Sequence, residues 1–226
     1  MSADASKPVV IFGATSQARL AAHFFATDSD REPVAFTVDR KFIVEPEFSG
    51  LPVVPFEEVG DTYPPADYDM FVALGYTDMN RLRAAKYEAA RALGYTLPSY
   101  VSSRCTYLSQ FEPGDNCLIL EDNTIQPFVR IGNNVTLWSG NHIGHDVRID
   151  DHVFLTSHVV VSGFVHIEPY SFLGVNATLR DDITIAERTL VGAGAVIMSD
   201  TEVAGVYLPP KTTKIDKSSD ELKISG

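Results

Sequence analysis

The chain has 226 residues, a formal net charge of −12 and a pI near 4.8. That length suits one large domain or two small ones, and an acidic surface repels phosphate backbones, so we expect no nucleic-acid partner. Only two cysteines are present, without a CxxC pair, which argues against a disulfide framework. We find neither a signal-peptide pattern nor a membrane-spanning apolar run, and therefore expect a cytoplasmic protein with no membrane partner.

The first hundred residues alternate between strand-like and helix-like segments. In chain order, the hydrophobic periodicity predicts strands at 8–13, 33–39, 52–59 and 69–75, and helices at 15–26 and 80–94. Thr15 or Ser16 is the expected N-cap of the first helix, and a glycine ends the second. This order predicts a small parallel α/β sheet in an N-terminal domain that covers residues 1–101.

Ligands of such sheets bind beyond the carboxyl ends of the strands. The candidate substrate-binding residues therefore follow three of the predicted strands: Gly13, Ala14, Thr15, Ser16, Asp39, Arg40, Gly75 and Tyr76. A glycine turn before a helix N-terminus offers free backbone N–H groups to a phosphate. Two alternatives stay open, a loop that only caps its helix and an NAD site, although the GxGxxG fingerprint of the latter is absent.

From Ile119 onward, aliphatic residues recur at every sixth position. All fourteen positions of this register up to Ile197 are Ile, Leu or Val, and small or β-branched residues mostly follow four positions later. A period of six fits neither a helix nor a flat strand, and it predicts short strands that turn corners, three to a coil of about eighteen residues. We expect a parallel β-helix over residues 102–211, with the repeated aliphatics pointing inward, and a C-terminal tail at 212–226.

This combination resembles the hexapeptide-repeat acyltransferases, and in particular the NeuD-like and PglD-like nucleotide-sugar acetyltransferases. The segment VVIFGATSQA stands where that family has a strand followed by a glycine-rich loop. The resemblance spans roughly residues 8–211. It implies a left-handed β-helix, a homotrimer with active sites between subunits, acetyl-CoA as co-substrate, and an N-terminal loop that holds the diphosphate of a nucleotide sugar.

The resemblance also implies roles for individual residues. The family's histidine followed by a carboxylate matches His145 and Asp146, which are the expected catalytic residues. The expected acetyl-CoA-binding residues are Gly163, Val175, Ala193, Gly194 and Lys211, the last from the ending Pro209-Pro210-Lys211. The chain departs from the family at Ser16-Gln17-Ala18, where relatives carry glycine-histidine-glycine, and this leaves the identity of the nucleotide open.

Four of the six histidines fall between positions 142 and 158. The eighteen-residue coil places Gly163 over His145, which leaves room for a thin ligand arm. Asn141 and His142 come just before this corner and are expected to line the substrate cleft. No two histidines lie eighteen apart, and the pair five apart that is typical of γ-carbonic-anhydrase-type hydratases is missing, so we expect no metal. A metal-dependent hydratase built between subunits stays an alternative.

Together these features predict an acetyl-CoA-dependent N-acetyltransferase that acts on the amino group of a nucleotide-linked amino sugar. His145 is the expected general base, the N–H of Gly163 is expected to hold the oxyanion, and no acyl-enzyme is needed. An O-acyltransferase that uses a sugar hydroxyl or another small acceptor fits the same chemistry. A non-catalytic trimeric prism is the third possibility.

Overall fold

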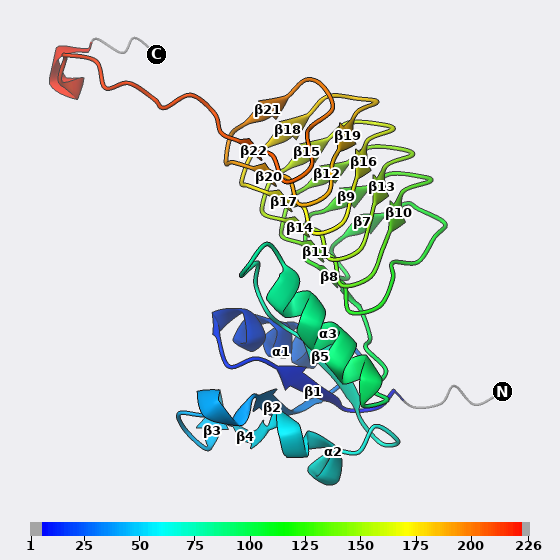
Figure 1. Ribbon diagram of the computed structural model, residues 1–226. Coiled ribbons are helices and arrows are strands. Elements are labelled where there is room, and N and C mark those ends of the chain that lie inside the picture. The colour runs from blue at the N-terminus through cyan, green and yellow to red at the C-terminus, as the bar shows by residue number, and fades with distance from the viewer. Residues whose placement is uncertain (1–5, 223–226) are drawn as a thin grey trace.

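The computed structural model describes residues 6–222 and shows an α/β domain joined to one end of a long triangular column (Figure 1). The first five residues of the expected N-terminal domain and the last four of the expected tail lie outside the described residues. Within residues 6–222, no helix has the length and apolar character needed to cross a bilayer.

The N-terminal sheet has five strands in the order β3-β4-β2-β1-β5. Four strands are parallel, as the sequence predicts: β1 (Val9–Phe12), β2 (Pro33–Val38), β4 (Leu51–Pro55) and β5 (Asp69–Val72). The fifth, β3 (Glu47–Phe48), is an antiparallel edge strand that the sequence analysis does not foresee. Ser49 and Gly50 both have positive φ, and two such residues make the tight turn that joins β3 to β4.

One helix covers each face of this sheet. Helix α1 (Ser16–Asp28) packs Ala18, Ala21 and Phe25 against one face, and α3 (Arg81–Ala92) packs Tyr87 and Ala90 against the other. The remaining helical segments are short: η1 (Arg40–Phe42), η2 (Phe56–Glu58), α2 (Val59–Thr62) and, in the C-terminal segment, η3 (Ser219–Glu221).

The column is a prism whose three faces are parallel sheets of two-residue strands. The faces have the orders β10-β13-β16-β19, β22-β20-β17-β14-β11-β8-β6 and β21-β18-β15-β12-β9-β7. Paired residues are eighteen apart through most of the column, as in Ile143 with Val161. The strands are β6 (Tyr100–Val101), β7 (Thr106–Tyr107), β8 (Leu118–Ile119), β9 (Thr124–Ile125), β10 (Arg130–Ile131), β11 (Thr136–Leu137), β12 (His142–Ile143), β13 (Arg148–Ile149), β14 (Phe154–Leu155), β15 (Val160–Val161), β16 (His166–Ile167), β17 (Phe172–Leu173), β18 (Thr178–Leu179), β19 (Thr184–Ile185), β20 (Leu190–Val191), β21 (Val196–Ile197) and β22 (Val206–Tyr207).

The predicted inward register is confirmed. None of the fourteen repeated aliphatics between Ile119 and Ile197 is more than 6% exposed, and together with the second register they form one continuous core. Each corner turns through a residue of positive φ, and these also recur every six positions: Asn116, Asp122, Phe128, Asn134, Gly140, Asp146, His152, His158, Phe164, Tyr170, Asn176, Asp182, Arg188 and Gly194. The backbone therefore repeats while the side chains at the corners vary.

Three stacks of corners run along the prism, and each has a different environment. The His145 corner is residues 144–147, with 126–129 and 162–165 in the coils before and after. The docked corner is residues 132–135, 150–153 and 168–171, which face helix α3. The third corner is residues 138–141, 156–159, 174–177 and 192–195.

A buried arginine joins the α/β domain to the docked corner. Arg83 of α3 is 1% exposed and donates to the carbonyl oxygens of Asn134 and His152, each at 2.9 Å, and to the hydroxyl of Thr136. Asn80, just before α3, accepts a further bond from the guanidinium. Burial lowers the pKa of Arg83 to about 9. The partners are neutral oxygens, so the arginine acts as a hydrogen-bond clamp between the two parts.

The far end of the prism is open. Strands β19, β22 and β21 stand at the ends of the three sheet orders, and Pro209 and Pro210 follow shortly after β22. Leu208 and Pro209 lie against Gly192. A Cβ at that position would stand 2.7 Å from Leu208 Cδ2, so the absence of a side chain there makes room for them. The chain then leaves the prism as an extended segment (Figure 1).

Candidate functional site

His145 lies at a corner of the prism with its side chain 51% exposed. Its Nδ1 is 3.0 Å from Oδ2 of Asp146, so the neutral ring donates Nδ1–H to the carboxylate and keeps Nε2 unprotonated. The backbone N–H of His145 donates to Oε1 of Gln126 at 2.8 Å, and the ring of Phe164 meets the imidazole edge to face at 4.9 Å. These contacts fix the ring with a basic nitrogen free.

Gly163 lies against this imidazole, as the eighteen-residue spacing predicts. A Cβ at position 163 would stand 2.8 Å from Cε1 and 2.9 Å from Nε2 of His145. Only glycine therefore leaves the edge that carries Nε2 uncovered. Within residues 6–222 the N–H of Gly163 also has no hydrogen-bond acceptor. An uncovered imidazole nitrogen and a glycine whose N–H has no acceptor within residues 6–222 thus belong to the same corner, which suits proton transfer beside a developing oxyanion.

The other expected acetyl-CoA residues lie away from the His145 corner. Val175, Ala193 and Gly194 belong to the third corner, where the N–H of Gly194 donates to the carbonyl of Val175. Val175 is 43% exposed, and a Cβ at Gly194 would meet nothing within 4 Å, so this surface is open. Lys211 is exposed on the segment that leaves the prism. A single chain does not bring these residues to His145.

Asn141 and the remaining histidines lie in different surroundings. Asn141 is 1% exposed, donates to the carbonyl of Trp138 and accepts from the N–H of Val159, so its amide holds the corner together. His142 is half-buried on β12. His158 lies over Gly140, where a Cβ would stand 2.5 Å from its Nδ1.

His152 belongs to the docked corner and is only 8% exposed. Its Nδ1 is 2.9 Å from the amide nitrogen of Asn134, and burial lowers its pKa to about 4. The four histidines of the segment therefore do not converge. Within residues 6–222, no three His, Cys, Asp or Glu side chains are grouped to hold a metal ion.

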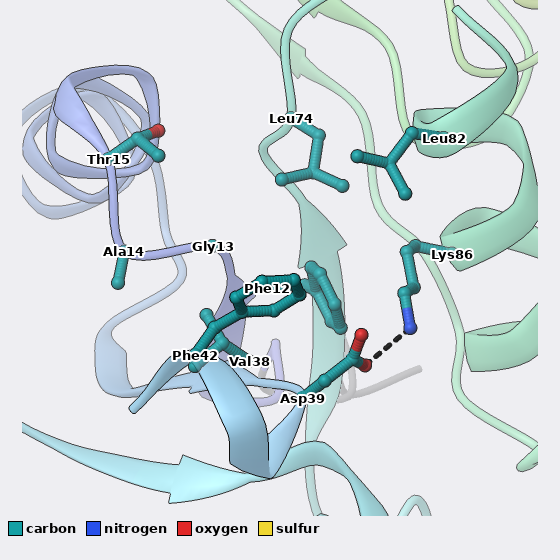
Figure 2. A pocket seen from close by; sticks show the side chains of 10 residues that line it. All are labelled: Phe12, Gly13, Ala14, Thr15, Val38, Asp39, Phe42, Leu74, Leu82 and Lys86. Carbon is teal, nitrogen blue, oxygen red and sulfur yellow. Dashed lines mark hydrogen bonds and ion pairs between the residues drawn. The ribbon is translucent and has the colours of Figure 1, made fainter. Parts of the chain in front are cut away.

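A second candidate site is a pocket of about 290 Å³ at the carboxyl edge of the N-terminal sheet (Figure 2). Four of the predicted substrate-binding residues line it: Gly13, Ala14, Thr15 and Asp39. The other lining residues are Phe12, Val38, Phe42, Leu74, Leu82 and Lys86. The walls are mainly apolar, with a loop at one end and the ion pair of Asp39 with Lys86 at the other (Figure 2).

The loop of this pocket presents unpaired backbone donors. Thr15 is the N-cap of α1 but makes no side-chain capping bond, and the first N–H bonded within the helix is that of Arg19. The N–H groups of Ser16, Gln17 and Ala18 have no acceptor within residues 6–222. Gly13 has a φ of +130°, and a Cβ there would stand 3.0 Å from the carbonyl oxygen of Ala73. This glycine lets the loop pass close to β5 and turn into α1.

Ser16, Arg40, Gly75 and Tyr76, the other four residues predicted at this sheet edge, do not line the pocket. Arg40 lines the adjoining hollow with Asp39 and Lys86 and pairs with Glu58. Gly75 lies under Gln17, whose side-chain amide donates to the carbonyl of Leu74 at 3.0 Å. Tyr76 turns toward the prism, with its ring 4.7 Å from that of Phe172 and 5.3 Å from that of Phe154.

Two features of these sites were missed by the sequence analysis. Lys86 and Leu82 reach the pocket from α3, and only their spacing of four on one helix face could have linked them to a common surface. Arg83 and Asn80, which clamp the prism, lie on the same helical segment. In the sequence, these polar side chains look like ordinary solvent-exposed residues of an amphipathic helix.

Comparisons with known proteins agree with this architecture. Residues 128–163 match the family model described as bacterial transferase hexapeptide (six repeats). No curated protein matches the sequence significantly. Among solved structures, the acetyltransferase domain of PglB from Neisseria gonorrhoeae is similar with a TM-score of 0.81 and 23% identity, over 90% of this chain and 97% of that chain.

Two further structures are similar over nearly their whole length. A variant of perosamine N-acetyltransferase from Caulobacter crescentus, in complex with CoA and GDP-perosamine, gives a TM-score of 0.78 at 24% identity and covers 92% of this chain and 97% of that chain. WeeI from Acinetobacter baumannii gives 0.75 at 20% identity, over 89% and 96%. These likenesses confirm the expected fold class, an α/β domain followed by a left-handed parallel β-helix of hexapeptide repeats.

Proposed function

We propose that the protein is an acetyl-CoA-dependent N-acetyltransferase that acts on the amino group of a nucleotide-linked amino sugar. The observation that carries the proposal is the His145 corner, where an oriented imidazole faces a gap that only glycine leaves open. The fold shared with PglB, perosamine N-acetyltransferase and WeeI supports the same reaction class. We also propose that the protein acts in the cytoplasm.

In this proposal His145 is the general base. Its Nε2 takes a proton from the attacking amine, and Asp146 stabilises the imidazolium that forms through the bond to Nδ1. The free N–H of Gly163 donates to the thioester oxygen as negative charge develops on it. The thiolate of CoA leaves, and the acetyl group ends on the sugar nitrogen. No side-chain nucleophile takes part, and burial raises the pKa of both Cys105 and Cys117 to about 11.

The pocket of the α/β domain is the proposed site for the nucleotide part of the acceptor. The unpaired N–H groups at the start of α1 suit the diphosphate, and helix α1 is long enough to add its dipole. Apolar walls next to this loop suit a base. The C. crescentus perosamine N-acetyltransferase was solved with CoA and GDP-perosamine bound, a pair of ligands of the proposed kind.

The active site is proposed to form between two subunits of a homotrimer. His145 and Gly163 lie at one corner of the prism, whereas Val175, Ala193 and Gly194 lie at another. A CoA molecule that contacts both sets therefore needs a second copy of the chain. This arrangement supports a closed three-fold assembly in which each cleft takes one corner from each neighbour.

The reaction is tested by incubating the full chain with acetyl-CoA and a panel of nucleotide-linked amino sugars and analysing the products by mass spectrometry and NMR. We expect one acetyl group on nitrogen for at least one acceptor. Acetylation at a hydroxyl alone would instead make the protein an O-acyltransferase. Absence of both acetyl-CoA binding and turnover would indicate a non-catalytic prism.

The shared cleft is tested by mixing two inactive variants. His145→Ala removes the base from one corner, and Ala193→Trp fills the CoA surface at the other. If the cleft combines both corners, subunit exchange creates some clefts that carry neither change, and activity returns to a measurable fraction of wild type. A mixture that stays inactive although native mass spectrometry shows trimers containing both variants would place both sets in one subunit's site.

A further inference from the structure

We infer that the pocket of the α/β domain selects guanine, so that the acceptor is a guanosine-diphosphate-linked amino sugar. The inference rests on the proposed function, because it names the base of the nucleotide that the pocket is proposed to hold. It is argued from one ion pair, that of Asp39 with Lys86, and from the aromatic residues around it (Figure 2).

The ion pair is held in a defined place at the end of the pocket. Asp39 follows β2 and Lys86 lies on α3, and their side chains are only 19% and 21% exposed. The ammonium group of Lys86 also lies 5.4 Å from the ring centre of Phe12 and 5.3 Å from that of Phe56. The carboxylate and the two aromatic rings together hold the ammonium group at this end of the pocket.

The pair keeps unused hydrogen-bonding capacity, and both of its residues line the pocket. Lys86 uses one of its three donors on Oδ1 of Asp39, and within residues 6–222 no other hydrogen bond reaches either side chain's charged group. The pocket end thus offers acceptor positions on a carboxylate next to free donors on an ammonium. A ligand would match this arrangement if its donors met the carboxylate of Asp39 and an adjacent acceptor met the ammonium group of Lys86.

Among the common bases, the Watson–Crick edge of guanine fits best. It carries two adjacent donors, N1–H and N2–H, which a carboxylate accepts together, and then the acceptor O6, which an ammonium reaches. Uracil and thymine have one donor between two carbonyl oxygens, so one of these oxygens would face the carboxylate. Adenine and cytosine offer the carboxylate only one donor group. Guanine alone makes all three bonds.

The walls of the pocket favour a purine over a pyrimidine. Phe42 lines the pocket, is 61% exposed and has no aromatic partner within residues 6–222. The ammonium group of Lys41 lies 4.9 Å from the centre of its ring, and a base that stacks on Phe42 would use the opposite face. Stacking and apolar burial both increase with the size of the ring system. The loop from Gly13 to Thr15 lies at the other end of the same pocket, where a diphosphate attached to the base would meet it.

The inference is tested by calorimetric titration of the full-length protein with GDP, IDP and UDP, with acetyl-CoA as a separate ligand. IDP keeps O6 and N1–H but lacks the 2-amino group. We expect GDP to bind about tenfold more tightly than IDP, since a hydrogen bond to a charged group contributes roughly that factor. UDP is expected to bind more weakly still.

The same titrations with Asp39→Asn assign the effect to the carboxylate. We expect the affinity for GDP to fall by about tenfold or more and the preference for GDP over IDP to disappear. Asp61→Asn, an exposed carboxylate on α2 of the same domain, is the matched control and should change neither value. Unchanged acetyl-CoA affinity and an unchanged circular dichroism spectrum would show that Asp39→Asn is folded.

The other outcomes separate this inference from the proposed function. If UDP binds most tightly, the selection of guanine is wrong while a nucleotide-linked acceptor stands. If GDP and IDP bind equally and Asp39→Asn weakens both alike, the carboxylate contacts the ribose and the inference is overturned. If acetyl-CoA binds but none of the three nucleotides does, the nucleotide-linked acceptor is wrong and the inference falls with it.

Discussion

Two corners of the same prism each carry a histidine beside an aspartate, and their surroundings make them opposites. At the His145 corner the histidine comes one residue before the position of positive φ, which Asp146 occupies. At the docked corner His152 itself occupies that position, after Asp151. The side chain of His145 is 51% exposed beside Gly163, whereas His152 is 8% exposed beneath helix α3.

Two things therefore determine the surroundings of a histidine in this prism. One is its position relative to the corner residue of positive φ, and the other is whether helix α3 covers that corner. At one corner Asp146 accepts the Nδ1–H bond and leaves Nε2 free. At the other, Asn134 approaches Nδ1 and the carbonyl of His152 accepts from the buried Arg83. One ring keeps an uncovered nitrogen at the surface, and the other is held neutral within a structural network. The following experiments test each half of this contrast.

The largest expected effect is that of His145→Ala on turnover. Loss of the general base should lower kcat by about 100-fold or more, with the thermal midpoint unchanged because the ring is half exposed. His23→Ala, which changes an exposed histidine on α1 away from both corners, is the control and should keep near wild-type kcat. His145 is not the base if the alanine variant, correctly folded, keeps more than about a tenth of wild-type turnover.

Next in size is the effect of Arg83→Met on stability. The change leaves the carbonyls of Asn134 and His152 buried without their donor and should lower the free energy of unfolding by about 2–4 kcal/mol. Urea denaturation followed by circular dichroism measures this. Arg81→Met is the control. Arg81 lies two residues before Arg83 on α3 and its side chain is half-exposed, so its loss should cost less than about 0.5 kcal/mol. Equal losses in both variants would contradict the clamp.

Gly163→Ala sharpens the catalytic half of the comparison. Its methyl group would press on the His145 ring and occupy the gap, so we expect kcat to fall by about tenfold and the KM for acetyl-CoA to rise. Steady-state kinetics measure both. Gly60→Ala, where an added Cβ meets nothing within 4 Å, should leave them unchanged. Wild-type kinetics in Gly163→Ala would show that the gap is not used.

The smallest effect is the pH dependence that His152 contributes. Its pKa falls from 6.5 in the unfolded chain to about 4 in the folded protein, so between these values the unfolded state binds more protons. The free energy of unfolding should therefore be unaffected by this group above pH 6.5 and should decline as the pH falls toward 4. The thermal midpoint of His152→Asn should fall less over this pH range than that of wild type. His23→Asn changes an exposed histidine, and its midpoint should follow wild type.

The prism was predictable because each of its residues obeys a local rule that repeats. The inward register and the stacking of Gly163 on His145 follow from the period alone, since the coil length fixes which residues lie over one another. The four parallel strands and the two long helices of the α/β domain also followed from hydrophobic patterning. The strand predicted at 52–59 was wrong in its second half, because β4 ends at Pro55 and the chain continues as η2 and α2. The carboxyl edge of its sheet was correctly chosen as the place of a pocket, and Asp39 does line it.

What the sequence did not reveal depends on contacts between distant segments. Arg83 looks like a solvated helix residue until the prism is placed against it, and Lys86 joins Asp39 across 47 positions of the chain. Asn141 looked like a substrate ligand because it comes shortly before His145. In the structure its side chain is buried, and its amide bonds to the backbone of Trp138 and Val159. The roles of His145, Gly163 and the third corner stay predictions that the experiments above address.

The open end of the prism has a consequence for how copies of the chain behave at high concentration. A stack of coils that ends in bare strand edges is a template on which a further coil, or another molecule's column, can grow end to end. Pro209 and Pro210 follow the last strand after Leu208, and proline lacks the N–H that a new rung would need. A chain segment with two prolines at this end is therefore a poor partner for a further rung.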